Sequence, residues 1–254
     1  MALALSSQIA RLIDRGALFV VNHSGGKDGQ AMLAILRQYI PADQLLVIHA
    51  HLPGVEWPGT IEHIRATTKG LPLIVCEAVK TFFQMVERRG MFPSPQQRQC
   101  TSDLKRGPIE REIRRYLKAN PRFGGLVVNC MGLRAQESPK RAKAQEFKFN
   151  ARNSKAGREW YDWLPVQDLT KDQVFAVIAA AGEKPHWAYG AGMTRLSCCF
   201  CIMASRQDLC TAARLRPKLY RRYVGLESRI GHTMMMPAKG EAPKYLEEIT
   251  GISA

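Results

Sequence analysis

The sequence predicts an α/β fold, a doubly wound parallel sheet followed by a helical, cysteine-rich C-terminal part. Short apolar runs alternate with segments of helical periodicity over residues 1–184, and that alternation is typical of a parallel sheet covered by helices on both faces. A glycine-rich turn directly follows the first apolar run. In residues 185–254 the strand pattern stops, and four of the seven cysteines occur there. We therefore expect an α/β domain over 1–184 and a helical region over 185–254.

The expected strands are short runs without a polar face, as strands buried on both sides are. They cover residues 17–21, 44–50, 71–76, 125–130 and 162–166. Apolar residues at helical spacing predict the helices between them. These cover residues 7–15, 30–39, 59–68, 80–89, 103–117 and 171–181.

Two further segments carry expectations of their own. Residues 138–158 are polar, basic and poor in large aliphatic side chains, so we expect an irregular loop over a site. Trp160, Tyr161 and Trp163 offer a large aromatic surface. Packing into a core or lid is favoured for them over a base-stacking platform.

Composition bounds the class of protein. The chain has 254 residues and a formal net charge of +15. Such an excess attracts polyanions and accompanies nucleic-acid binding, although it also serves solubility and attracts small nucleotides. No apolar run approaches the ~18 residues of a transmembrane helix. The apolar residues 1–5 have no basic n-region, so they do not read as a signal peptide, and we expect a cytoplasmic protein without a membrane partner. Seven cysteines in such a protein favour metal or redox chemistry over disulfides.

The glycine-rich turn has the composition of a phosphate-binding loop. Glycines let the backbone approach an anion, and the N-terminus of the following helix supplies free N–H groups and partial positive charge. The turn has only two glycines before Lys27, so it is neither a Walker A loop nor a dinucleotide fingerprint. An ordinary strand-to-helix turn would leave Lys27 and Asp28 unexplained. The candidate phosphate-binding residues are Ser24, Gly25, Gly26, Lys27, Asp28 and Gly29.

This loop resembles the PP-loop of the N-type ATP pyrophosphatases and of the PAPS-reductase family, whose fold is the HUP type of the adenine nucleotide alpha-hydrolases. Residues 131–141 resemble the second nucleotide motif of that family, Gly-x-Arg-x-x-Glu-Ser-x-x-Arg. The resemblance spans roughly residues 17–215 and implies that the protein binds ATP with Mg²⁺. It implies nucleotide-binding roles for Gly132, Arg134, Glu137 and Ser138, and catalytic roles for Lys27, Asp28, Arg134 and Arg141.

The chain departs from the family pattern at two of these positions. Gly29 stands where the loop usually has serine, which removes one hydroxyl contact to phosphate. His51, in a segment that otherwise matches the family over residues 49–58, stands where the family usually has aspartate.

The cysteines form a second constellation. Cys198, Cys201 and Cys210 supply three thiolates, and Cys100 is available as the fourth. Four thiolates bind zinc or an iron–sulfur cluster, and spacing does not separate the two.

Residues 98–101 and 189–201 resemble motifs of the PAPS-reductase branch that includes the DNA-phosphorothioation protein DndC and many phage-encoded members, with Ser197 in place of glycine. That resemblance implies a 4Fe-4S cluster, with zinc as the alternative. Its ligands are then Cys100, Cys198, Cys201 and Cys210.

The other cysteines have different expected roles. Cys199 is a spare thiol or exchanges with Cys198 as a ligand. Cys76 and Cys130, at strand ends, are expected in the core, where free cysteines are common. Lys105 is a candidate anion contact near the cluster.

The resemblance implies an enzyme that adenylates an acceptor, releases pyrophosphate and lets sulfur or nitrogen displace AMP. The basic composition points to tRNA or DNA as the acceptor, with a sulfur or electron donor protein as a further partner. The alternative activity is an oxidoreductase that converts PAPS to sulfite. Such reductases carry a nucleophilic cysteine in a C-terminal segment, whereas residues 240–254 contain none. A third alternative, a nucleic-acid-binding protein with a structural metal, leaves the phosphate loop without a role.

Overall fold

The computed structural model describes residues 5–237 and 239–254. The expectation about a signal peptide falls mainly on residues 1–4, outside this range. The chain divides into two compact units. The first, here the sheet unit, comprises residues up to His49, Thr60–Cys76 and Ile109–His186. The second, here the cysteine unit, comprises Ala50–Gly59, Glu77–Pro108 and Trp187–Ala254.

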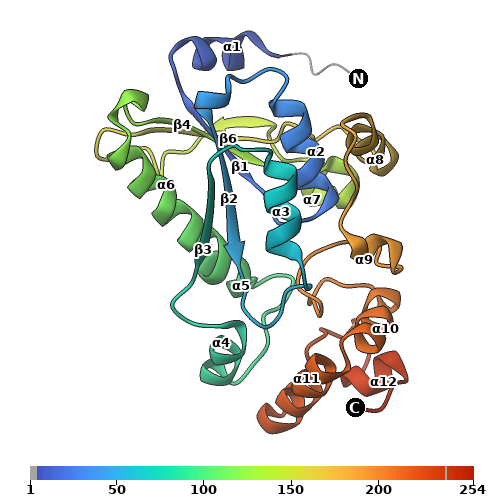
Figure 1. Cartoon of the computed structure of the whole chain (residues 1–254). Coiled ribbons are helices and arrows are strands. Elements are labelled where there is room, and N and C mark those ends of the chain that lie inside the picture. Colours follow the sequence, from blue (N-terminus) through green and yellow to red (C-terminus); the bar gives the residue numbers. More distant parts are fainter. Residues whose placement is uncertain (1–4, 238) are drawn as a thin grey trace. The chain divides into compact units, whose positions relative to one another are not determined.

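Six strands form one sheet in the order β3-β2-β1-β4-β6-β5 (Figure 1). Strand β1 pairs in parallel with β2 and with β4, and β4 pairs in parallel with β6. Only the pairing of β5 with β6 is antiparallel among those whose register is described. The strands are β1 (Leu18–Asn22), β2 (Leu45–His51), β3 (Leu73–Glu77), β4 (Leu126–Met131), β5 (Phe147–Phe149) and β6 (Glu159–Trp163). The predicted α/β class with a mostly parallel sheet is confirmed.

Helices follow the strands of the sheet unit, and helices make up the regular structure described for most of the cysteine unit. The sheet unit holds α1 (Ser7–Asp14), α2 (Lys27–Leu36), α3 (Thr60–Thr68), most of α6 (Gly107–Ala119), α7 (Pro139–Ala142) and α8 (Lys171–Ala180), with single turns η1 (Ala42–Gln44), η3 (Pro121–Phe123) and η4 (Ala135–Glu137). The cysteine unit holds α4 (Phe82–Arg89), α5 (Gln99–Thr101), the π-helical turn η2 (Ser102–Arg106), α9 (Trp187–Gly190), α10 (Arg206–Leu215), α11 (Pro217–Ile230) and α12 (Leu246–Thr250). The predicted helical C-terminal part that carries cysteines is thus confirmed.

The core of the sheet unit explains why β1 has no polar face. Phe19 and Val21 pack in one cluster with α2, Ile64 of α3 and Val174 of α8. Leu18 and Val20 point to the other face and are also fully buried. Figure 1 shows α6 on one side of the strands and α2 and α3 on the other. Helices on both faces remove both faces of the central strands from water, which requires continuous apolar runs.

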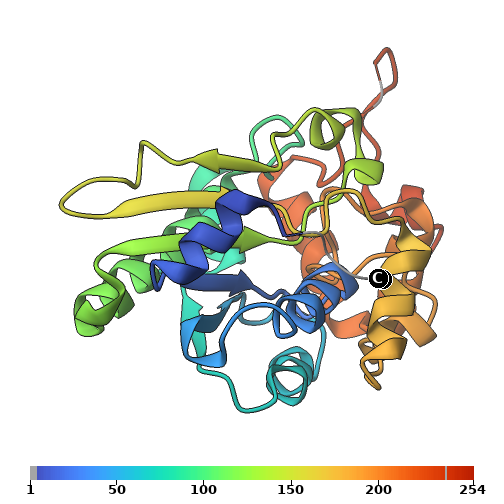
Figure 2. The same ribbon diagram turned by 90° about the horizontal axis from the view of Figure 1, so that it is seen from above.

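Three sequence expectations are wrong in their limits. Helix α2 begins at Lys27, three residues earlier than predicted, because Gly26 adopts an extended N-cap conformation (φ −81°, ψ 160°). Strand β6 begins at Glu159 and ends before Leu164-Pro165, so the aromatic run itself is the strand. The expected irregular loop over 138–158 contains α7 and β5. Figure 2 shows β5 beside β6, and Phe147 stacks on Tyr161 with ring centroids 5.0 Å apart.

The aromatic run before Leu164 belongs to the core, as favoured. Trp160 is 0% and Trp163 2% exposed, so neither offers a platform for a base. Between the strands, Asn22 donates to Asn129, and Asn129 donates to Asp162, at 2.7 and 3.0 Å. This polar chain links β1, β4 and β6 side by side.

The cysteine unit has its own aromatic core. Tyr223 of α11 packs against Phe82, Phe83, Phe92 and Phe200, with centroids 5.0–6.3 Å away. Within the described residues, no helix is both long and apolar enough to cross a bilayer.

Candidate functional site

The glycine turn places an uncapped helix N-terminus at the carboxyl end of β1. Gly25 adopts φ +77°, a conformation that glycine reaches without strain. Gly26 is the N-cap of α2, and no side chain caps the helix there. The Ser24 side chain is exposed at the tip of the turn. Unsatisfied N–H groups at the start of a helix form a ready anion site.

His23 stabilises the turn through a hydrogen bond to its backbone, a role that the sequence did not reveal. Its ring is 1% exposed, and its Nδ1 accepts the N–H of Gly25 at 3.0 Å. The proton therefore sits on Nε2, which donates to Thr67 Oγ1 at 3.2 Å. His49 Nδ1 donates to the His23 carbonyl at 2.9 Å. Burial lowers the pKa of His23 to about 3, so the ring stays neutral and keeps its acceptor for Gly25 at physiological pH.

This buried histidine makes a testable contribution to acid sensitivity. Because its pKa is about 3 in the fold and about 6.5 unfolded, the unfolded chain binds the extra proton first. Between these two values the free energy of unfolding decreases as the pH decreases, by at most about 1.4 kcal/mol per pH unit from this group. We expect His23→Asn, which retains an acceptor near Nδ1, to lose less stability than the native protein between pH 7 and pH 5. Urea unfolding of both proteins across this range measures the difference. Parallel pH profiles would contradict the assignment.

The second nucleotide motif meets the loop through Arg134. Its Nε donates to Asp28 Oδ1 at 2.5 Å, while Lys27 Nζ lies 3.0 Å from Asp28 Oδ2. Lys27 and Arg134 are each 4% exposed. Asp28 and Arg134 are 106 positions apart in the chain, and the pairing of β1 with β4 brings them together. One carboxylate thus positions two buried cations beside the start of α2.

Two glycines permit this approach. A Cβ on Gly132 would lie 3.0 Å from the carbonyl carbon of Asp28 and 3.1 Å from the nitrogen of Gly29. A Cβ on Gly29 would lie 3.3 Å from both the Asn22 oxygen and the His23 Cα. Gly29 therefore stands where backbone packing leaves little space for the serine that the family pattern has. Gly132 lets β4 deliver its motif directly against the first turn of α2.

The rest of the second motif is organised by Glu137. Its carboxylate accepts the backbone N–H of Arg134 at 3.0 Å and forms an ion pair with Arg141. Ser138 is the N-cap of α7, and its hydroxyl accepts the N–H of Arg141 at 3.3 Å. Gln136 accepts from Arg134 at 2.8 Å and from the Lys171 backbone at 2.9 Å. These contacts, with that of Arg134 Nη1 to the Leu169 carbonyl at 3.2 Å, fix the orientation of the Arg134 guanidinium.

A second group of predicted residues gathers in the cysteine unit. Cys100 lies on α5, and Cys198 and Cys201 lie in the segment between α9 and α10; all three are half-buried. The thiol groups of Cys198, Cys201 and Cys100 raise the pKa of Lys105, because negative charge on them stabilises the ammonium. Burial raises the pKa of Cys198 to about 12, against the opposing effect of Lys105. Three of the four predicted ligands thus raise the pKa of the same lysine, Lys105 of η2.

Two hydroxyls near these cysteines test whether a metal–sulfur group fits. Within the described residues, Tyr223 Oη and Ser197 Oγ are buried without a hydrogen-bond partner. Burial, and then negative charge on Cys198, Cys199, Cys201 and Cys100, raise the pKa of Tyr223 far above its ordinary value. Donors without an acceptor beside soft sulfur ligands suit an anionic thiolate-bound group. The residues present therefore fit an iron–sulfur cluster.

The other cysteines divide clearly. Cys199 is fully buried in the aromatic core, and its backbone N–H donates to the Val55 carbonyl at 2.8 Å. Burial raises the pKa of Cys199 to about 12. Cys130 is 0% and Cys76 5% exposed, so both are core residues as expected. Cys210 Sγ lies 3.5 Å from the Thr250 carbonyl oxygen, to which its thiol donates.

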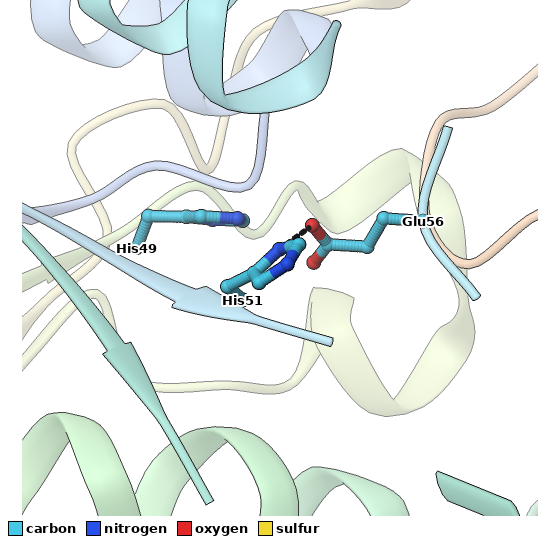
Figure 3. Close-up of side chains that lie close together, drawn as sticks. All are labelled: His49, His51 and Glu56. Carbon is cyan, nitrogen blue, oxygen red and sulfur yellow. Dashed lines mark hydrogen bonds and ion pairs between the residues drawn. The ribbon is translucent and has the colours of Figure 1, made fainter. Parts of the chain in front are cut away.

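Two acidic residues support the cysteine segment without a signal in the sequence. Asp208 of α10 is fully buried and accepts the N–H and the hydroxyl of Thr194, both at 2.7 Å. Glu56 accepts from His51 Nδ1 at 2.7 Å (Figure 3). Negative charge on Glu56 also raises the pKa of Lys105. His51 stands where the family pattern has aspartate. It supplies no carboxylate of its own, but it pairs with the carboxylate of Glu56.

Comparison with known proteins follows the same motifs. Residues 19–204 match the family model described as the phosphoadenosine phosphosulfate reductase domain. The chain belongs to the phosphoadenosine phosphosulfate reductase family. The match to the reductase family includes the glycine turn, the Arg134 motif and three of the four predicted cysteine ligands, and it ends before Cys210.

Relatives of this reductase-family chain include an uncharacterized protein of Escherichia phage 186, 29% identical over 66% of the chain and 52% of the relative. Another is an uncharacterized protein of Methanocaldococcus jannaschii, 26% identical over 82% of the chain and 47% of the relative. The chain spans about half the length of these relatives.

Solved structures with a similar fold include the PAPS reductase of Candida auris, with 12% identity, a TM-score of 0.47, and 78% of this chain and 98% of that chain covered. The U34-tRNA thiolase NcsA of Methanococcus maripaludis has 14% identity and a TM-score of 0.42, and the match covers 96% of this chain and 87% of that chain. Similarity at this level does not indicate what this member of the reductase family binds.

Proposed function

We propose that the protein is an ATP pyrophosphatase that adenylates an acceptor in preparation for sulfur transfer. The observation that carries the proposal is the convergence of Lys27, Asp28 and Arg134 at the uncapped N-terminus of α2. Strand β1 lies between β2 and β4, so the chain leaves the centre of the sheet in both directions. Ligands of open α/β sheets bind at the carboxyl end of strands at such a switch point.

The geometry supports a defined division of labour in that reaction. The acceptor oxygen attacks the α-phosphorus of ATP, the bond to the β-phosphate breaks, and pyrophosphate leaves. The free N–H groups of α2 and the ammonium of Lys27 bind the phosphates that leave, since both are preorganised there. Arg134 and Arg141 add charge from the second motif. Asp28 and Glu137 position these cations and are the carboxylates available to Mg²⁺.

The cysteine unit is proposed to hold a 4Fe-4S cluster on Cys100, Cys198 and Cys201, with Cys210 as the fourth ligand. Such a cluster supplies electron transfer or a binding position for sulfur. Lys105 and the Tyr223 hydroxyl would donate hydrogen bonds to its sulfur atoms, which stabilises negative charge there. Zinc is the alternative occupant of the same thiolates.

The acceptor is proposed to be a nucleic acid, tRNA or DNA. The formal net charge of +15 favours a polyanionic partner. A sulfur nucleophile from a donor protein would then displace AMP at the activated carbon, and the C–O bond would break as the C–S bond forms.

Reduction of PAPS to sulfite is the second proposal, and the description of the matching family model favours it. Calorimetric titration of anaerobically purified, iron-quantified protein with ATP–Mg²⁺ and with PAPS separates the two. We expect ATP to bind at least about tenfold more tightly, because each additional charge-assisted contact contributes roughly 1.5–3 kcal/mol. Tighter binding of PAPS, with sulfite release in the presence of a thiol reductant, would contradict adenylation.

A further inference from the structure

A basic groove lies on the sheet unit between α6 and the loop that precedes β6. Figure 1 shows that loop beside one end of α6. The groove has a volume of about 520 Å³. Its cationic lining residues are Arg111, Arg114, Arg115, Lys118 and Arg158.

Part of this positive charge is left without a local counterion. Arg111 and Arg115 share the carboxylate of Glu112, at 2.9 and 2.8 Å. Within the described residues, no carboxylate forms an ion pair with Arg114, Lys118 or Arg158. The two nearest other carboxylates on these elements are engaged elsewhere, Glu110 with Arg152 and Glu159 with Arg15.

Arg158 carries a hydrogen-bond donor that has no acceptor in the described part of the chain. Its Nε is buried and has no hydrogen-bond partner within the described residues. A buried N–H without a partner destabilises the fold, and a hydrogen bond to an anionic oxygen of a ligand would remove that cost. Arg158 and the unpaired cations Arg114 and Lys118 line the same groove.

Two glycines form part of the groove lining. Gly125 and Gly157 both line it, with φ of +75° and +76°. A Cβ on Gly125 would lie 2.4 Å from the Gly157 carbonyl oxygen, so the two segments meet without intervening side chains at this point. Backbone without side chains there lets a ligand approach closely.

The spacing of the cations fits a chain of phosphates better than one anion. Arg111, Arg114 or Arg115, and Lys118 recur at helical spacing along one side of α6. At 1.5 Å per residue they span about 10 Å of helix axis. A nucleic-acid strand rises about 3.4 Å per phosphate, so roughly three phosphates face this length.

We propose that this groove binds the phosphodiester backbone of a nucleic acid. The proposal deepens the function proposed above and rests on it for the acceptor class. The groove would position the polynucleotide through its backbone and leave base recognition to other residues.

The test is binding of fluorescein-labelled transfer RNA and of a DNA duplex, measured by anisotropy over a series of salt concentrations. The test variant combines Arg114→Ala, Lys118→Ala and Arg158→Ala. We expect at least about tenfold weaker binding and a salt slope smaller by about two to three, because each lost phosphate contact removes about one released counterion. The double variant Arg114→Ala/Lys118→Ala keeps the half-buried Arg158 and controls for misfolding; its salt slope should fall by about two.

The matched control removes the same charge from exposed cations of the sheet unit outside the groove, by Arg11→Ala, Arg65→Ala and Lys184→Ala. Equal losses in both triple variants would show attraction by net charge alone and would overturn the groove proposal, as would unchanged binding in the test variants. Preference for RNA or for DNA identifies which backbone is bound. The affinity for ATP–Mg²⁺, measured by calorimetry without nucleic acid, should be native-like in the groove variants, so failure of the groove is distinguishable from failure of the nucleotide site.

Discussion

Replacing Lys27 by alanine is expected to reduce ATP–pyrophosphate exchange by about 100-fold or more. The ammonium is 4% exposed beside the free N-terminus of α2, and a cation so preorganised stabilises developing negative charge strongly. Removing one such donor commonly costs roughly 10²–10³ in rate. Exchange of labelled pyrophosphate into ATP measures the loss, and calorimetry measures the accompanying loss of ATP affinity.

Lys184→Ala is the control for Lys27→Ala, because Lys184 is an exposed lysine of the same unit. It should exchange pyrophosphate as the native protein does. The Lys27 variant should still bind nucleic acid, since its loss changes one contact in the phosphate loop and none in the groove. Native exchange in Lys27→Ala would contradict the role proposed for Lys27, whereas a native protein without exchange would favour a nucleic-acid-binding protein with a structural metal.

Serine in place of Cys100, Cys198 or Cys201 is expected to remove most of the bound iron from anaerobically reconstituted protein. A hydroxyl is a weaker ligand for iron than a thiolate. These three thiols also share one environment, since all three raise the pKa of Lys105. Cys210→Ser should lower iron content less, because that thiol already lies against the Thr250 carbonyl. Iron and sulfide analysis, with the visible absorbance of the cluster, gives the order of effects.

Cys76→Ser is the matched control for the cysteine series. It makes the same chemical change at a cysteine of the sheet unit that is 5% exposed. It should retain the native iron content at some cost in stability, because a hydroxyl replaces a buried thiol. Full iron in the Cys198 and Cys201 variants would refute the ligand assignment, and stoichiometric zinc in place of iron would refute the cluster.

The prediction from sequence succeeded where signals are local. Strands without a polar face, such as residues 18–22, indicate burial on both sides, and the glycine turn indicates that a helix follows directly. It failed for residues 139–149, where α7 and β5 form. Those elements are too short to have a period of their own, and β5 exists because Phe147 and Phe149 find Tyr161 on a neighbouring strand.

The identities of Lys27, Arg134 and the cysteine set, and with them the family, followed from the amino-acid sequence by itself, since residue types at fixed spacing carry that chemistry. What only the tertiary structure decided is which distant groups share an environment. Arg134 reaches Asp28 because β4 pairs with β1, and Cys199 enters the aromatic core while its neighbour Cys198 acts on Lys105. The neutral His23 beneath the turn and the unpaired Nε of Arg158 are likewise products of folding. Burial, pKa and hydrogen-bond satisfaction depend on contacts across the chain, which no local pattern records.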